Sequence, residues 1–208
     1  MTQATMTDAF RGHLTGFDLA ALEEHESTII GVDEALGIGY LNAAWFRFSA
    51  ANGGDPAISA RWGLGASIWP AIPAPLQPFY RQFFSSARSL NHAPTHPMTH
   101  EYECSSADVY RRLVLAVYPL RDDHGLLLVH SLRVQRPHDP HERSAQEPDA
   151  SRYAHPDGMI RQCSHCRRVQ LAADLKAWHW IPEWVRSCPG NTSHSLCPVC
   201  LDYYYPAV

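Results

Sequence analysis

Two Cys-x-x-Cys pairs near the C-terminus constrain this 208-residue chain more than any other feature. Cys163 and Cys166 form the first pair, and Cys197 and Cys200 form the second. Two cysteines at this spacing can bind one metal ion from a single turn, and two such pairs complete a tetrahedron of soft sulfur ligands. Because four cysteines leave no coordination position for a substrate, the pattern predicts one structural zinc ion.

Other uses of these cysteines stay open. His194 is the alternative ligand, because an imidazole can replace one thiolate. It could instead donate a hydrogen bond to one of the cysteine ligands. Disulfides and free thiols are the alternatives to metal. The N-terminal sequence MTQATMTDAFRGHL lacks the features of a secretion signal, and no apolar run is long enough to cross a bilayer. We therefore expect a cytoplasmic protein with reduced thiols and no membrane association.

The composition divides the chain into four parts. With 45% hydrophobic residues it can form a core, but residues 135–158 are rich in proline and charge and contain few apolar side chains. This stretch is typical of a solvated linker, and we prefer that interpretation to a second metal site built from its histidines, His138, His141 and His155. The expected parts are an N-terminal helical segment (1–23), a first domain (24–134), the linker (135–158) and a cysteine module (159–208).

The first domain has strands at both ends and helices between them. The expected strands cover 27–33, 36–41, 98–104, 110–118 and 125–134. Asn42 should cap a short helix that Gly53-Gly54 ends, and its aromatic residues should be mostly buried. A longer helix is expected over 74–90, because apolar residues recur there every three or four positions. Residues 121–125 form a hairpin turn between the last two strands. This order predicts an α+β domain whose helices pack on one face of an antiparallel sheet.

These segments resemble a PAS domain. STIIGVDEALGIGYLNAAWFRFSAANGG is similar to that family's opening strand, turn, strand and Asn-led helix, and HEYECSSADVYRRLVLAVYPLRDDHGLLLVHSL is similar to its closing three strands. The resemblance covers about residues 24–134. It implies a five-stranded antiparallel sheet and a role in small-molecule sensing or dimerisation. A helix from Phe10 to Glu24 could form a homodimer contact.

Residues 160–206 resemble a small cysteine-rich module of bacterial PAS-containing signalling proteins. The similar segments are CSHCRRVQ, WHWIPEWV and TSHSLCPVCLDYYYP. We expect the first cysteine pair on a knuckle after a strand, with His165 exposed, and the second pair at the start of a helix. This layout resembles a treble-clef zinc finger. The middle segment departs from the acidic, lysine-rich version of that family, which implies a different choice of partner.

Three tryptophans in the module allow two interpretations. Trp178 and Trp180 alternate with other residues, so both should face one side of a strand, and Trp184 follows closely. They could form a miniature core around the metal, which a module of this size needs. The alternative is an exposed aromatic patch that docks a partner protein.

The PAS-like domain offers a candidate cavity between its sheet and helices. Plain core is the simpler interpretation of the large side chains there: Trp45, Phe48, Trp69, Phe79, Phe83 and Tyr102. Flavin-binding relatives carry an Asn-Cys-Arg motif that this chain lacks, and Cys104 falls on a strand instead. Haem-binding relatives need a histidine on the long helix, where there is none, although His92 and His96 follow it. The PAS ligand therefore stays unidentified, and zinc is the cofactor that the sequence predicts.

No catalytic pattern is present, so we expect no enzyme. Phosphate-binding glycine loops, nucleophile motifs and spaced carboxylate pairs are all missing from the sequence. The net charge of −4, together with the −2 charge of a four-thiolate zinc site, argues against nucleic acid. We expect a non-enzymatic signalling adaptor whose module docks a signalling protein. The alternatives are a zinc-dependent DNA-binding regulator and a Cys-x-x-Cys redox protein.

Overall fold

The computed structural model describes residues 5–52, 61–89, 96–121 and 125–206, and the chain divides into two compact units. The first unit contains Met1–Ile72, Leu76–His100 and Val114–Ser131, and the second contains Pro73–Pro75, Glu101–Leu113 and Leu132–Val208. Three of the dividing points fall inside strands, so these strands belong partly to each unit. None of the helices in the described part of the chain combines the length and the apolar character that crossing a bilayer needs.

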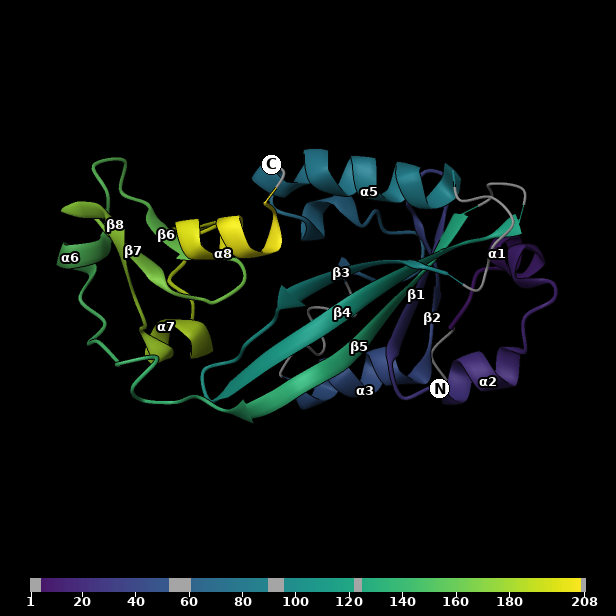
Figure 1. Ribbon diagram of the computed structural model, residues 1–208, viewed down its shortest axis with the longest axis horizontal. Coiled ribbons are helices and arrows are strands. Elements are labelled where there is room, and N and C mark those ends of the chain that lie inside the picture. Colours follow the sequence, from purple (N-terminus) through teal and green to yellow (C-terminus); the bar gives the residue numbers. More distant parts are fainter. Residues whose placement is uncertain (1–4, 53–60, 90–95, 122–124, 207–208) are drawn as a thin grey trace. The chain divides into compact units, whose positions relative to one another are not determined.

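A five-stranded antiparallel sheet is the framework of the α+β fold (Figure 1). Its strands lie in the order β2-β1-β5-β4-β3. Strand β1 pairs antiparallel with both β2 and β5, which sets Ile29 opposite Val129. The strands are β1 (Thr28–Asp33), β2 (Ile38–Leu41), β3 (Met98–Glu103), β4 (Val109–Pro119) and β5 (Gly125–Pro137). All five expected strands are thus confirmed, and β5 runs three residues further than expected.

The helices of the first unit follow local signals in the sequence. Asn42 caps α3 (Ala43–Ala51), as predicted, because its side chain accepts a hydrogen bond from the backbone N–H of Trp45. The helix is followed by Asn52, and the expected stop at Gly53-Gly54 lies outside the described residues. The predicted long helix is a 3-10 turn, η3 (Ala74–Leu76), continued by α5 (Gln77–Ser89). Another 3-10 turn, η2 (Trp69–Ala71), precedes them. The expected turn over 121–125 also lies mostly outside the described residues.

The N-terminal segment differs from the single helix expected from Phe10 to Glu24. It consists of α1 (Asp8–Arg11), the 3-10 turn η1 (Gly12–Leu14) and α2 (Leu19–Glu24), and Gly16 between them has φ +95°. Phe10 and Leu14 are 2% exposed and pack against the sheet. Their partners in this cluster are Ile29, Tyr40, Leu120 and Leu127. Phe10 and Leu14 were expected to lie on one face of a continuous helix that contacts another helix. They pack on the sheet instead, and the chain forms two short helices and a turn.

Both faces of the sheet are buried at β5, and the N-terminal segment, which was expected to lie apart from the sheet, covers one of them. Leu127 faces the N-terminal segment. Since alternate residues of a strand point to opposite faces, Leu126 and Leu128 face the other side of the sheet, and both are also buried there. The continuous apolar run in β5 is the sequence signal for this arrangement, since a strand buried on both sides does not alternate.

The second unit contains its own four-stranded sheet, in the order β8-β7-β6-β9. Strand β6 pairs antiparallel with β7 and parallel with β9. Its elements are α6 (Ala150–Tyr153), β6 (Ile160–Cys163), β7 (Val169–Leu171), β8 (Asp174–His179), α7 (Pro182–Arg186), β9 (Thr192–Ser195) and α8 (Pro198–Tyr204). A small core beneath the sheet consists of Tyr153, Ile160, Val169, Ile181 and Trp184.

Residues 135–158 are not a solvated linker. Tyr153 is fully buried in the small core, and Arg143 and His155 are 8% and 4% exposed. The main chain also pairs here, since the N–H of Gln146 donates to the carbonyl oxygen of Trp180 at 2.8 Å. The composition did not predict that this segment is folded, because its buried residues are isolated in the sequence and form no periodic apolar pattern.

Candidate metal centre

The four predicted cysteines come together in one buried cluster. Their Sγ atoms all lie within 4.8 Å of one another, and the Sγ atoms of Cys166 and Cys197 are 3.7 Å apart. A zinc ion with four Zn–S bonds of about 2.3 Å requires sulfur atoms roughly 3.8 Å apart in a tetrahedron. A disulfide requires about 2.05 Å, and all six cysteines of the chain are free. The arrangement therefore fits a metal ion and not a disulfide.

Each cysteine pair is placed by the element that carries it. Cys163 ends β6, and the following turn closes when the N–H of Arg167 donates to the carbonyl oxygen of Cys163 at 3.1 Å. Arg167 has φ +62°, which turns the chain back into β7. Cys197 is the N-cap of α8, and its Sγ accepts a hydrogen bond from the N–H of Cys200 at 3.4 Å. Pro198 fits the first helical turn because its missing N–H is not needed there.

The four thiols differ in pKa because they hydrogen-bond to one another. Hydrogen bonds from neighbouring thiols, first from Cys166, lower the pKa of Cys163. Hydrogen bonding with Cys163, above all, raises the pKa of Cys200. The four sulfurs therefore share protons and do not all ionise together. Since only thiolates bind metal, a bound cation would displace these protons and make metal affinity depend on pH.

The rival ligands are not part of the cluster. His194 lies on β9 and is exposed, and it does not belong to the four-sulfur group. Within the described residues, no other group of three or more His, Cys, Asp or Glu side chains is close enough to hold a metal ion. His138 instead places Nε2 2.8 Å from the carbonyl oxygen of Ser106, and His141 is exposed. Cys104 is partly buried and Cys188 is exposed, and neither joins the cluster.

His165 is buried, contrary to the expectation that it would be exposed on the knuckle. Only 6% of its surface is exposed, its Nδ1 lies 3.0 Å from the carbonyl oxygen of Glu103, and its Nε2 lies 2.8 Å from the hydroxyl of Tyr205. Burial lowers the pKa of His165, so the ring is neutral at pH 7. The sequence could not show this, because both partners are distant in the chain.

The three tryptophans of the module contribute to its interior in different places. Trp178 is partly buried against the cysteine cluster. Trp184 is 9% exposed and packs in the small core, whereas Trp180 is 4% exposed and contacts the guanidinium of Arg143. The miniature core around the metal site is confirmed for Trp178 alone, because Trp180 and Trp184 are buried elsewhere in the unit, and the exposed aromatic patch of three tryptophans does not form.

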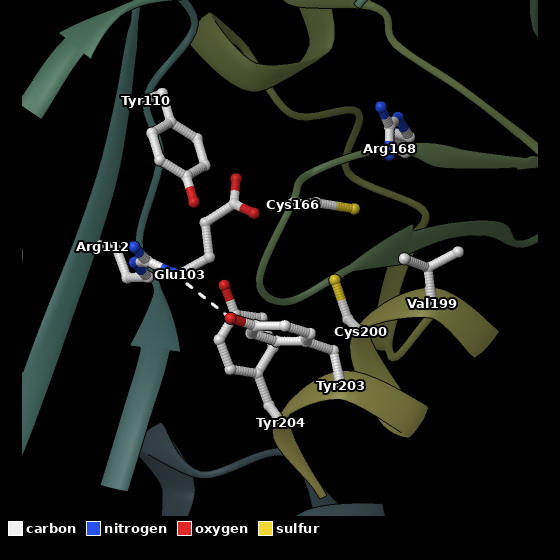
Figure 2. Close-up of a pocket in the computed structure, with 9 residues that line it drawn as sticks. All are labelled: Glu103, Tyr110, Arg112, Cys166, Arg168, Val199, Cys200, Tyr203 and Tyr204. Atoms are coloured by element: carbon white, nitrogen blue, oxygen red, sulfur yellow. Dashed lines mark hydrogen bonds between the residues drawn. The ribbon is translucent and has the colours of Figure 1, made fainter. Parts of the chain in front are cut away.

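A pocket of about 240 Å³ lies beside the cluster within the second unit (Figure 2). Cys166 and Cys200 line it, one from each pair, while Cys163 and Cys197 do not. Val199 and Tyr203 on α8 are 68% and 61% exposed. The remaining lining residues are Glu103, Tyr110, Arg112, Arg168 and Tyr204. Sequence patterns gave no indication of this pocket, because its walls come from three separate segments.

The residues predicted to line a PAS ligand cavity divide between the units. Tyr102 belongs to the second unit, where its ring lies 6.2 Å from that of His165. Phe48 is 39% exposed, so its expected burial is wrong. The other four, Trp45, Trp69, Phe79 and Phe83, belong to the first unit, and Phe79 and Phe83 stack with ring centroids 5.7 Å apart. Of the two histidines weighed as haem ligands, His92 lies outside the described residues and His96 is exposed.

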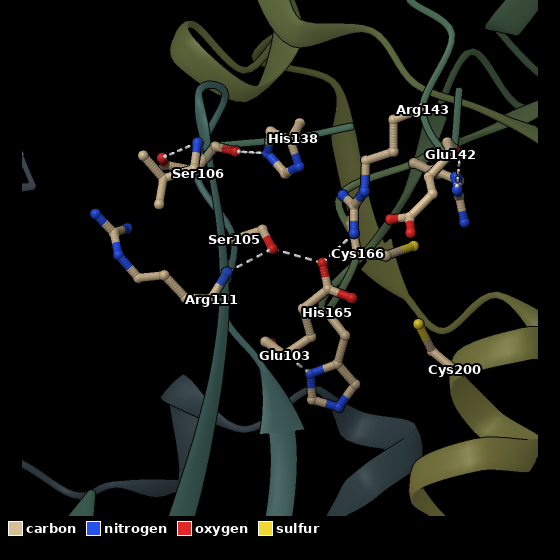
Figure 3. A network of polar contacts seen from close by, with 12 residues as sticks. Glu103, Ser105, Ser106, Arg111, His138, Glu142, Arg143, His165, Cys166 and Cys200 are labelled. Carbon is tan, nitrogen blue, oxygen red and sulfur yellow. Dashed lines mark hydrogen bonds and ion pairs between the residues drawn. The ribbon is translucent and has the colours of Figure 1, made fainter. Parts of the chain in front are cut away.

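Sequence reasoning also missed a buried polar network next to the first cysteine pair (Figure 3). Arg143 pairs with Glu103, and both side chains are almost fully buried, at 6% and 7% exposure. Arg143 also donates to the carbonyl oxygen of Cys166 at 2.8 Å. In the sequence both residues look like ordinary surface charges, and nothing in their spacing indicates that they meet.

No protein-family model matches the chain, and no curated protein matches it. Among solved structures, it is similar to the PAS domain of an HTR-like protein from Haloarcula marismortui, with 16% sequence identity and a TM-score of 0.33. The similarity covers 60% of this chain and 96% of that one. Since a similarity of this size does not identify a fold, the α+β description depends on the strands and their pairing alone.

Proposed function

We propose that this protein is a non-enzymatic, cytoplasmic signalling adaptor whose C-terminal module is held together by one structural zinc ion. In this proposal the PAS-like domain senses a small molecule or dimerises, and the module docks a signalling protein. The observation that carries the proposal is the cluster of four buried Sγ atoms within 4.8 Å of one another.

Zinc is the metal that this donor set favours. Four sulfur ligands in a tetrahedron suit zinc or iron, whereas magnesium and calcium prefer oxygen. Cys163, Cys166, Cys197 and Cys200 would hold the ion and leave no open position, so the ion would stabilise structure and activate no substrate. The second unit has only a small apolar core, so we expect a bound metal ion to contribute much of the free energy that keeps this unit folded.

A PAS-like first unit is supported by its order of elements. Two strands, an Asn-capped helix, a longer helix and three strands follow one another as the family resemblance implies. A ligand that signals must bind two arrangements of this unit unequally. Strands β3, β4 and β5 each belong partly to both units. We expect a conformational change in the first unit to reach the second through these strands.

Metal analysis of cysteine variants tests the proposal. We expect one zinc ion per chain in the wild-type protein and none in Cys197→Ser. Cys188→Ser is the matched control, because Cys188 is exposed and lies outside the cluster, and it should keep the metal. Iron in place of zinc would overturn the metal assignment. Metal-free protein with a Cys-x-x-Cys disulfide would favour the redox alternative.

The docking proposal needs a test that is separate from metal binding. Tyr203→Ala changes an exposed side chain of α8 that is not one of the side chains packed against the four cysteines, so zinc content should be unchanged. We expect this variant to lose signalling output in the host cell while the matched exposed change Leu175→Ala on β8 does not. Retained salt-dependent binding of the module to DNA would instead favour the transcription-regulator alternative.

A further inference from the structure

The turn that carries Cys163 and Cys166 is held from outside the metal centre. Arg143 donates from Nη1 to the carbonyl oxygen of Cys166 and pairs through Nη2 with the carboxylate of Glu103 (Figure 3). Because desolvation offsets much of the attraction in a buried ion pair, such a pair is weak evidence for stability. Its position behind a metal-binding turn points to a different purpose.

Both charged groups are fixed in place by further contacts. The carboxylate of Glu103 accepts a second hydrogen bond from the hydroxyl of Ser105, at 2.5 Å, and the same hydroxyl accepts one from the N–H of Arg111, at 3.3 Å. The guanidinium of Arg143 lies over the ring of Trp180, 4.9 Å from its centroid. A rigid guanidinium with a fixed partner can hold the Cys166 carbonyl in one orientation.

His165 provides a second connection between the same two segments. Its Nδ1 contacts the backbone carbonyl oxygen of Glu103, and because a carbonyl only accepts, Nδ1 carries the proton. Its Nε2 faces the hydroxyl of Tyr205, just after α8. The turn between Cys163 and Cys166 is thus tied to β3 through both the side chain and the main chain of Glu103.

We infer that Arg143, Glu103 and His165 are positioning residues of the metal centre, and that they link metal binding to the hairpin between β3 and β4. Groups behind the ligands fix ligand orientation and strengthen metal binding. Linkage is reciprocal, so if the hairpin contacts favour the metal-bound turn, the bound metal stabilises the hairpin contacts equally. The inference rests on the metal site of the proposed function.

Zinc affinity of the full-length chain tests the positioning role. Competition with a chromophoric zinc chelator should show affinity about 10- to 100-fold weaker for Arg143→Met than for wild type. Arg136→Met is the matched control, because Arg136 pairs with Glu142 at 2.8 Å on the exposed surface, and its affinity should not change. The zinc affinity of Arg143→Lys should lie between those of wild type and Arg143→Met, since lysine keeps the positive charge but cannot donate to two partners in the fixed geometry of a guanidinium.

A double variant separates positioning from folding. Glu103→Gln with Arg143→Met leaves no unpaired buried charge, so it should retain the far-ultraviolet circular dichroism of the wild type. We expect its zinc affinity to stay reduced, because Cys166 still lacks its donor. Wild-type affinity in both the single and the double variant would overturn the inference.

Hydrogen exchange tests the link in the other direction. The hairpin contains the bond from the N–H of Cys104 to the carbonyl oxygen of Arg111, at 3.0 Å. Removing zinc should speed amide exchange over residues 101–113 in the wild type and have a smaller effect in Arg143→Met. Unchanged exchange on zinc removal would overturn the link. Wild-type protein that binds no metal would overturn the proposed function instead, so the two failures are distinguishable.

Discussion

At the scale of single residues, the amide of Asn42 connects three elements of the first unit. Its Oδ1 accepts hydrogen bonds from the N–H of Ile29 at 2.9 Å and of Trp45 at 3.2 Å. Its Nδ2 donates to the carbonyl oxygen of Ser27 at 2.9 Å and also contacts the carbonyl oxygen of Leu22 at the end of α2. The residue is 0% exposed, so its lost partners could not be replaced by water.

Asn42→Ala should therefore lower the free energy of unfolding by much more than the loss of an ordinary helix cap does. Removing a cap costs about 1 kcal/mol, and one buried group left without a partner adds roughly 1–3 kcal/mol. We expect a total loss of about 2–4 kcal/mol in urea unfolding. Asn52→Ala, at the exposed other end of the same helix, should cost under about 1 kcal/mol. Equal costs for the two variants would show that Asn42 has no special structural role.

His130 on β5 should make stability depend on pH. Burial lowers its pKa from 6.5 to about 4. Between these values the unfolded chain binds a proton that the folded chain does not, so stability falls as the pH falls from about 6.5 to about 4. Since the side chain keeps some exposure, we expect a loss of roughly 1–3 kcal/mol.

The contribution of His130 can be isolated by comparison with a variant. Urea unfolding of His130→Gln at pH 7.5 and pH 5 should show a smaller loss of stability on acidification than the wild type. The same loss in both proteins would mean that other groups carry the pH dependence.

At the scale of elements, two glycines allow the N-terminal segment to pack on the sheet. A Cβ at Gly39 on β2 would overlap the ring of Phe10, and a Cβ at Gly31 on β1 would do the same. Gly39→Ala should cost about 1–3 kcal/mol through overpacking. At Gly12 nothing lies within 4 Å of an added Cβ, so Gly12→Ala should have little effect.

A second substitution tests whether Phe10 is the cause. Phe10→Ala should remove the overlap with the ring but not the close approach of the Cβ of residue 10, at 2.8 Å. Gly39→Ala should therefore destabilise the fold less in that background, as a double-mutant cycle would show. Additive effects of the two substitutions would contradict the close packing of α1 on β2.

Elements with strong local signals could be predicted from the sequence, and contacts between distant segments could not. Periodic apolar residues indicated α5, and Asn42 marked the start of α3, because helix faces and caps depend on neighbouring residues. Phe10 misled the prediction, since its partner is the sheet. For the candidate site, spacing alone identified all four cysteines. Arg143 and Glu103 were missed because a buried ion pair leaves no periodic pattern.

At the scale of the whole molecule, the metal centre should stabilise the second unit more than the first. The cysteine cluster and the small core both belong to the second unit, whereas the cluster around Phe10 belongs to the first. Zinc removal should raise amide exchange strongly over residues 150–206 and weakly over residues 28–51. Equal increases over both regions would show that the chain unfolds as one cooperative body.

The most direct test of the structural zinc site is a native mass spectrum of the full chain, expressed without added metal, beside a denatured control. We expect the mass of the chain plus one zinc ion under native conditions, and the mass of the chain alone after denaturation. A further mass that is also lost on denaturation would identify a small-molecule ligand of the chain. A native spectrum with no zinc would contradict the account of the four-cysteine centre.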